Sequence, residues 1–263
     1  MPPEKIRVLA DVTACLRGVA GVAGVVLGGS HATGTARPDS DLDIGLYYRE
    51  AAPFSIDQVR SIAESISVKQ PTPVVTKMYE WGPWVNGGAW IQTPSGEVDF
   101  LYRNLDQVEK VIQESRQGVW RHDYDQQPPY GFRSTVYLGE TLICVPLHDP
   151  FGEIARLKEM VAVYPDALRD RIIQDALWGA EFSLWAGRNA AAGPDIYIAA
   201  GCMTRAAQFL VHAVFALNRQ YYFSDKSASR RIDRFAVRPT DFTSRLGAVL
   251  AGPGGNPEEL RRR

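Results

Sequence analysis

Cysteine is scarce in this sequence. The chain of 263 residues holds three cysteines, which stand far apart at Cys15, Cys144 and Cys202. No CxxC pair occurs, and an odd number of distant cysteines indicates neither a zinc site nor a disulfide framework. We therefore expect reduced thiols packed in a core, as in a cytoplasmic protein.

An excess of charge of one sign is also missing. The sequence has 29 Lys and Arg against 30 Asp and Glu, which gives a net charge of −1. Such a chain has no global positive field, and this argues against a protein that grips long DNA or RNA. Arg261, Arg262 and Arg263 follow a Gly/Pro-rich stretch, and we expect them to form a solvated tail.

Long apolar runs are absent as well. No stretch reaches the ~18 apolar residues that suggest a membrane span. The first residues, MPPEKIRVLADVTACLRG, mix charged side chains among apolar ones, unlike the apolar block of a secretory signal. These absences predict a cytoplasmic location.

What is present is an alternation of strand and helix patterns, followed by helical patterns alone. The sequence predicts strands at 22–27, 41–48, 74–79, 84–92 and 97–102, and helices at 4–19, 56–68 (with Ser55 as N-cap) and 105–117. Beyond His148 it predicts long helices at 154–163, 167–188 and 196–219. The fold class is therefore α+β: a small mixed β-sheet domain at residues 1–147, then an all-α helical bundle at residues 148–263.

A glycine turn and a pair of carboxylates carry the chemistry. The predicted strand at 22–27 runs into Gly28, Gly29 and Ser30, where glycine lets a ligand approach the backbone closely and a helix start suits a phosphate. Asp41 and Asp43 follow on the next strand, two residues apart and therefore on one face. Such close carboxylates repel each other unless a cation lies between them, and Mg²⁺ prefers oxygen ligands.

A third acid belongs to an alternating strand at 97–102, where Glu97 and Asp99 share the polar face. If this strand lies beside the one that carries Asp41 and Asp43, then Asp99 completes a cluster of three carboxylates. Such a cluster can hold one or two Mg²⁺ ions.

This pattern of two glycines and a serine, ten intervening residues, DxD and a later lone acid resembles the DNA polymerase β superfamily of nucleotidyltransferases. Gly29, Ser30, Asp41, Asp43 and Asp99 fall on the motif positions. The wider pattern is similar to stand-alone bacterial nucleotidyltransferase-domain proteins, including kanamycin- and lincosamide-type antibiotic nucleotidyltransferases.

The resemblance implies transfer of a nucleoside monophosphate from a nucleoside triphosphate, expected to be ATP, to an acceptor hydroxyl with release of pyrophosphate. Asp41, Asp43 and Asp99 would bind metal, and Gly29 and Ser30 would hold the β- and γ-phosphates. Asp99, or Glu97 on the same face, would take the acceptor's proton. Lys226 is a further candidate for contact with the triphosphate, because a flexible ammonium suits a phosphate.

The acceptor stays open between two classes. One is an antibiotic-like small molecule; the other is a macromolecule, as for a toxin-like enzyme that modifies tRNA or a protein. The near-neutral charge favours the first, since tRNA binding usually needs a basic face. A non-catalytic nucleotide-binding protein is a third reading, against which the intact carboxylate set argues. Trp81, Trp84 and Trp90 are candidates for stacking on a base or an acceptor, or for anchoring the core.

Overall fold

The computed structural model describes every residue except 191–194, 253, 255, 257 and 260–263. The predicted solvated tail at 261–263 therefore lies outside the described residues. The described chain forms two compact units, which are considered separately below. Unit 1 comprises Met1–Gln113 and Arg121–Val163, and unit 2 comprises Glu114–Trp120 and Tyr164–Arg263.

Unit 1 is built on a six-stranded mixed sheet with the strand order β3-β4-β5-β2-β1-β8. β2 and β5 are parallel, and the other neighbouring strands are antiparallel. A two-stranded hairpin, β6–β7, lies apart from this sheet. The strands are β1 (Gly24–Leu27), β2 (Leu42–Tyr48), β3 (Val74–Val75), β4 (Gly88–Thr93), β5 (Gly96–Asn104), β6 (His122–Asp123), β7 (Phe132–Arg133) and β8 (Val145–His148).

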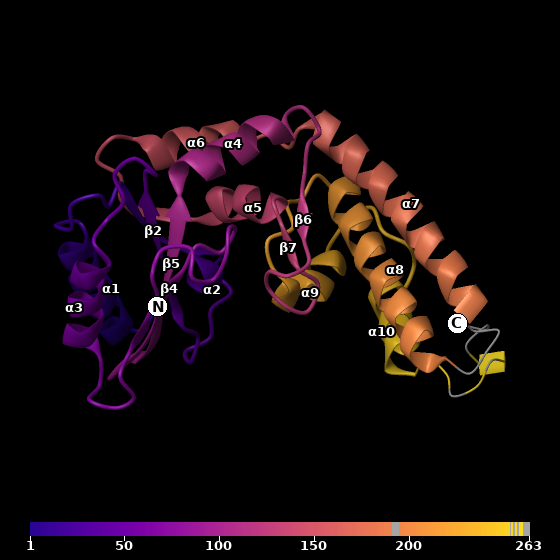
Figure 1. Cartoon of the computed structure of the whole chain (residues 1–263), viewed down its shortest axis with the longest axis horizontal. Helices are drawn as coiled ribbons and strands as arrows, with labels where there is room; N and C mark the ends of the chain where they lie inside the picture. Colours follow the sequence, from indigo (N-terminus) through magenta and orange to yellow (C-terminus); the bar gives the residue numbers. More distant parts are fainter. Residues whose placement is uncertain (191–194, 253, 255, 257, 260–263) are drawn as a thin grey trace. The chain divides into compact units, whose positions relative to one another are not determined.

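The helices of unit 1 lie on both faces of the sheet and beyond its end (Figure 1). They are α1 (Pro3–Leu16), α2 (Gly29–Ala32), α3 (Ile56–Ile66), α4 (Leu105–Ser115), α5 (Thr135–Ile143) and α6 (Glu153–Val161), with the last residues of α4 assigned to unit 2. Ser55 caps α3 by accepting a hydrogen bond from the Gln58 N–H, as its sequence position predicts. α5, β8 and the β6–β7 hairpin have no counterpart among the predicted elements.

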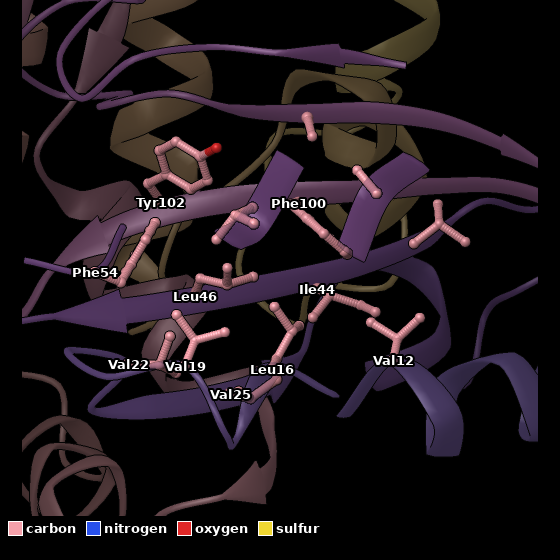
Figure 2. Close-up of a cluster of buried hydrophobic side chains, with 14 of the residues drawn as sticks. Val12, Leu16, Val19, Val22, Val25, Ile44, Leu46, Phe54, Phe100 and Tyr102 are labelled. Carbon is pink, nitrogen blue, oxygen red and sulfur yellow. The ribbon is translucent and has the colours of Figure 1, made fainter. Parts of the chain in front are cut away.

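The core of unit 1 lies between α1, α3 and one face of the sheet (Figure 2). Successive strand residues point to opposite faces, so β2 and β5 each send alternate side chains into this core. Ile44, Leu46, Phe100 and Tyr102 are all fully buried there. Asp43 and Asp99 directly precede Ile44 and Phe100 in the sequence, and their side chains therefore belong to the opposite face.

Unit 2 is helical. Its elements are α7 (Asp166–Ala190), α8 (Ile196–Leu217), a 3₁₀ turn (Asp225–Ser227), α9 (Ala228–Ile232) and α10 (Phe242–Ala251). α7 packs along α8 over most of its length, and α8 in turn contacts α9 and α10. A mixed-sheet region followed by several helices confirms the predicted fold class.

α8 is long and apolar enough to cross a membrane when length and composition alone are counted, a test that the core helix of a soluble protein also passes. Thr204, Arg205 and Gln208 interrupt its apolar residues. For that reason the sequence does not predict a span there.

The predicted domain boundary at residues 147 and 148 falls inside β8, which pairs with β1 in the main sheet. The compact units divide later, at Val163 and Tyr164. Pro146 and Pro150 make this segment look like a linker in the sequence. An edge strand tolerates proline, however, because its outer N–H groups have no ladder partner.

Candidate active site

Asp43 and Asp99 are direct neighbours in the sheet. β2 and β5 run parallel, and the register pairs Asp43 with Asp99. Paired residues of adjacent strands point to the same face, with backbones ~4.8 Å apart. The condition under which Asp99 can join the other acids, that its strand lies beside the strand of Asp43, is therefore met, although 55 residues separate the two acids in the sequence.

The Asp43 carboxylate lies directly against the backbone of the glycine turn. The Gly28 N–H donates to the Asp43 carbonyl oxygen at 2.8 Å and fixes the turn beside β2. Gly29 has φ +56°, and a Cβ built on it would stand 1.7 Å from Oδ2 of Asp43. Only glycine leaves room for the carboxylate here. The spacing of the motif thus brings a ligand-approachable turn and an acid into one place.

The remaining predicted residues flank this pair. Asp41 comes just before β2, which begins at Leu42, and it is half-buried. Ser30 is half-buried in the single turn α2. Glu97 shares the face of Asp99 on β5, and the register places it opposite Gln92.

The fit of a metal ion follows from these positions. Among the residues that the structure describes, no three His, Cys, Asp or Glu side chains are grouped closely enough to form a ready-made metal centre. Mg²⁺, however, is commonly held by one or two carboxylates, with substrate phosphates and water in its other positions. The adjacent carboxylates of Asp43 and Asp99 fit that kind of site.

Comparison with known families agrees with this geometry. Residues 12–117 match the nucleotidyltransferase domain. The matched segment contains the glycine turn, Asp41, Asp43 and Asp99. It supports the nucleotidyltransferase superfamily and, in general terms, the transfer of a nucleoside monophosphate from a nucleoside triphosphate.

Other comparisons add less. Residues 140–226 match a domain of unknown function, DUF4037. A solved structure, a nucleotidyltransferase-like protein from Exiguobacterium sibiricum 255-15, aligns with 98% of this chain and 73% of its own at 10% identity and a TM-score of 0.37. No curated protein matches the chain.

A buried ion pair holds α5 on the acid-bearing face of the nucleotidyltransferase-like region. Nε and Nη2 of Arg103 donate to the two carboxylate oxygens of Glu140 at 2.8 and 2.9 Å. Arg103 lies four residues after Asp99 on β5 and therefore on the same face. Burial raises the pKa of Tyr47, the register partner of Arg103. α5 thus covers one end of this face and leaves Asp43 and Asp99 half-buried at the other.

Two tryptophans complete the face beyond Asp99. The register pairs Trp90 of β4 with Asp99, and 46% of the Trp90 residue surface is exposed. The Trp81 ring lies 4.5 Å from the Trp90 ring, centroid to centroid, with 35° between their planes. Trp84 differs, because it stacks on Phe132 and touches Tyr137. Trp81 and Trp90 therefore belong to the candidate site, and Trp84 anchors the core.

Lys226 belongs to unit 2, in the 3₁₀ turn Asp225–Ser227, and its side chain is exposed. Its role at the triphosphate stays a prediction. Arg103 and Glu140 were not identified from the sequence. Each acts through a partner distant in the sequence, and no local pattern marks such a partner.

Proposed function

We propose that this protein is a nucleotidyltransferase that moves a nucleoside monophosphate from ATP to the hydroxyl of a small acceptor molecule. The pairing of Asp43 with Asp99 beside the Gly29 turn carries the proposal. It places two acids and a close-approach backbone on one face of one sheet, within the segment that matches the nucleotidyltransferase domain.

In the proposed reaction, the acceptor oxygen bonds to the α-phosphorus while the bond from that phosphorus to the bridging oxygen breaks. Pyrophosphate leaves, and the hydroxyl proton passes to Asp99, with Glu97 as the alternative base. The backbone at Gly29 and the hydroxyl of Ser30 hold the β- and γ-phosphates. Positioning and charge neutralisation supply most of the rate in such transfers.

Asp43 and Asp99, with Asp41, would hold Mg²⁺, which supplies charge neutralisation on the triphosphate when it is bound. The near-neutral net charge supports a small acceptor over tRNA. Among small acceptors, antibiotic-like molecules with several hydroxyls remain our first choice, by resemblance to the kanamycin- and lincosamide-type enzymes.

The test is transfer of label from each of the four α-labelled ribonucleoside triphosphates, with Mg²⁺ and a panel of aminoglycosides, lincosamides, glycosides that carry a planar ring, and tRNA. We expect label on one class of acceptor and a rate about 10²–10³ lower in Asp43→Asn, the loss typical when one electrostatic group at the reacting centre is removed. Asp11→Asn is the matched control, because Asp11 is an exposed acid on α1, on the other side of the sheet. A wild-type rate of label transfer in Asp43→Asn, or the absence of transfer from any of the four triphosphates, would contradict the proposal.

A further inference from the structure

The candidate site has a linear order across the sheet. Gly28 of the glycine turn is hydrogen-bonded to Asp43 on β2. The strand register then pairs Asp43 with Asp99 on β5, and Asp99 with Trp90 on β4. The proposed phosphate side therefore lies at one end of the row and Trp90 at the other. An acceptor that places its hydroxyl at Asp99 has Trp90 as its next neighbour.

Trp81 is held beside Trp90 by a loop of fixed shape. Gly88 precedes Trp90 by two residues on the same face, and a Cβ on Gly88 would stand 2.9 Å from Cζ3 of Trp81. The Trp81 indole therefore lies over the backbone of β4 at Gly88. Together, the two indoles form a broad aromatic surface next to Asp99.

Three side chains fix the loop that carries Trp81. Oε1 of Gln126 accepts from the N–H groups of Trp84 and Val85 at 3.0 and 3.1 Å, and its Nε2 donates to the Trp81 carbonyl. Nε2 of Gln107 donates to the Pro83 carbonyl at 2.8 Å, and the Tyr137 hydroxyl to the Trp84 carbonyl at 2.5 Å. An aromatic wall fixed in this way loses little entropy when a ligand stacks on it.

The charges around the two indoles select against an anion. On β4 and the facing part of β5, the described residues of this face are Gly88, Trp90, Gln92, Glu97, Asp99 and Leu101. None of these is a cation, and two are acids. A phosphate or carboxylate on the acceptor would meet repulsion from Glu97 and would find no cationic side chain on these two strand segments.

From this order we propose that Trp81 and Trp90 form the acceptor subsite, and that the small hydroxyl-bearing acceptor carries a planar ring next to its reacting hydroxyl, unlike an aminoglycoside, and no negative charge. The proposal rests on the proposed function for the role of Asp99. Stacking of a planar ring on an aromatic side chain contributes about five- to 150-fold in affinity, the equivalent of ~1–3 kcal/mol.

Binding to the full-length protein tests the proposal without relying on catalysis. The probes form two pairs, each with a ring-bearing compound and its methyl counterpart. Adenosine is compared with methyl β-ribofuranoside, and phenyl β-glucopyranoside is compared with methyl β-glucopyranoside. Each probe is titrated by ligand-observed NMR in the presence of Mg²⁺ and a saturating non-hydrolysable ATP analogue. We expect at least one ring-bearing probe to bind five-fold or more tightly than its methyl partner. Phenyl β-glucuronide, its anionic counterpart, should bind more weakly than phenyl β-glucopyranoside.

The variants decide where the preference arises. Trp90→Ala and Trp81→Ala should each reduce the preference for the ring, and Trp90→Phe should keep it. Trp178→Ala is the control, since Trp178 of α7 is a tryptophan of unit 2 that is 67% exposed and stacked on Phe182. Equal binding of ring-bearing and methyl probes, or a preference that survives in Trp90→Ala, would overturn the proposal.

The two proposals fail separately. Asp43→Asn should lower the transfer rate about 10²–10³-fold and leave the ring preference intact. If the wild-type protein shows the ring preference and transfers no label, then the subsite stands and the proposed reaction falls.

Discussion

Gly29 shows how a single residue links the backbone to the chemistry. Its φ of +56° disfavours any side chain, and the space where a Cβ would stand is filled by the Asp43 carboxylate. Gly34, five residues later, has a similar φ of +69° with no atom within 4 Å of its virtual Cβ. A comparison of alanine substitutions at the two glycines therefore distinguishes the effect of backbone strain, which both share, from the effect of displacing the Asp43 carboxylate, which only Gly29 has.

We predict that Gly29→Ala and Gly34→Ala will each destabilise the fold by about 1–2 kcal/mol through the left-handed backbone. Only Gly29→Ala should also reduce nucleotidyl transfer, by tenfold or more, because the new methyl group must push Asp43 aside. Urea unfolding measures the loss of stability in the two variants, and the transfer assay measures their activity. Equal activity of the two variants would mean that the position of Asp43 does not matter for the reaction.

The Arg103–Glu140 pair fixes the position of one element, α5, on the sheet. It joins β5 to α5 through two parallel hydrogen bonds, and the Arg103 side chain is 5% exposed. Removal of one partner leaves the other charge buried and unpaired, which typically costs about 3–5 kcal/mol.

We therefore expect Glu140→Leu to destabilise unit 1 by an amount in that range, and the double variant Arg103→Met/Glu140→Leu to recover part of the loss. A double-mutant cycle measures this coupling. It compares the thermal unfolding of the wild type, of Arg103→Met, of Glu140→Leu and of the double variant. An additive double variant would show that the two groups do not depend on each other.

Elements with strong local patterns were predicted well, and those defined by distant partners were not. The acid strands were expected at 41–48 and 97–102 and occur at Leu42–Tyr48 and Gly96–Asn104. The strand expected at 74–79 stops at Val75, since Lys77 begins a turn in which its N–H donates to Glu80. α5 was missed because its nearly uniform burial, from Thr135 to Gly139, gives no amphipathic period.

The candidate site divides along the same line. Gly29 and Asp43 can be identified from the sequence because a known spacing marks them, and Asp99 because it is an acid on the polar face of an alternating strand. The adjacency of Trp90 to Asp99 depends on which strand pairs with β5 and in which register, and side-chain types along β4 do not fix that choice.

At the scale of the whole molecule, the boundary between the compact units makes a direct prediction. A chain ending at residue 163 keeps β8 and α6, whose Ile154, Leu157 and Val161 are 1% exposed. A chain ending at residue 147 cuts β8 and removes the ion pair between Arg49 and Glu153, which is 2.7 Å long.

We expect fragment 1–163 to be more soluble and to unfold more cooperatively than fragment 1–147. Expression yield and the sharpness of urea unfolding provide the measurements. The longer fragment still lacks the partners of Trp120, whose Nε1 donates to Asp175 at 2.9 Å, and should be less stable than the whole chain. A well-folded fragment 1–147 would contradict this expectation and support the boundary that the sequence predicts.

The parallel pairing of β2 with β5 has a consequence for how such a protein can change. All the chain between Tyr48 and Gly96, with α3, β3, β4 and the loop of Trp81, is an excursion that leaves the sheet centre and returns to it. Within it, α3 and β4 belong to the core and the sheet, whereas the loop between Val75 and Gly88, which carries Trp81, has no register partner on either acid-bearing strand. New acceptors can therefore be accommodated by remodelling this one loop, while the reacting centre stays as it is.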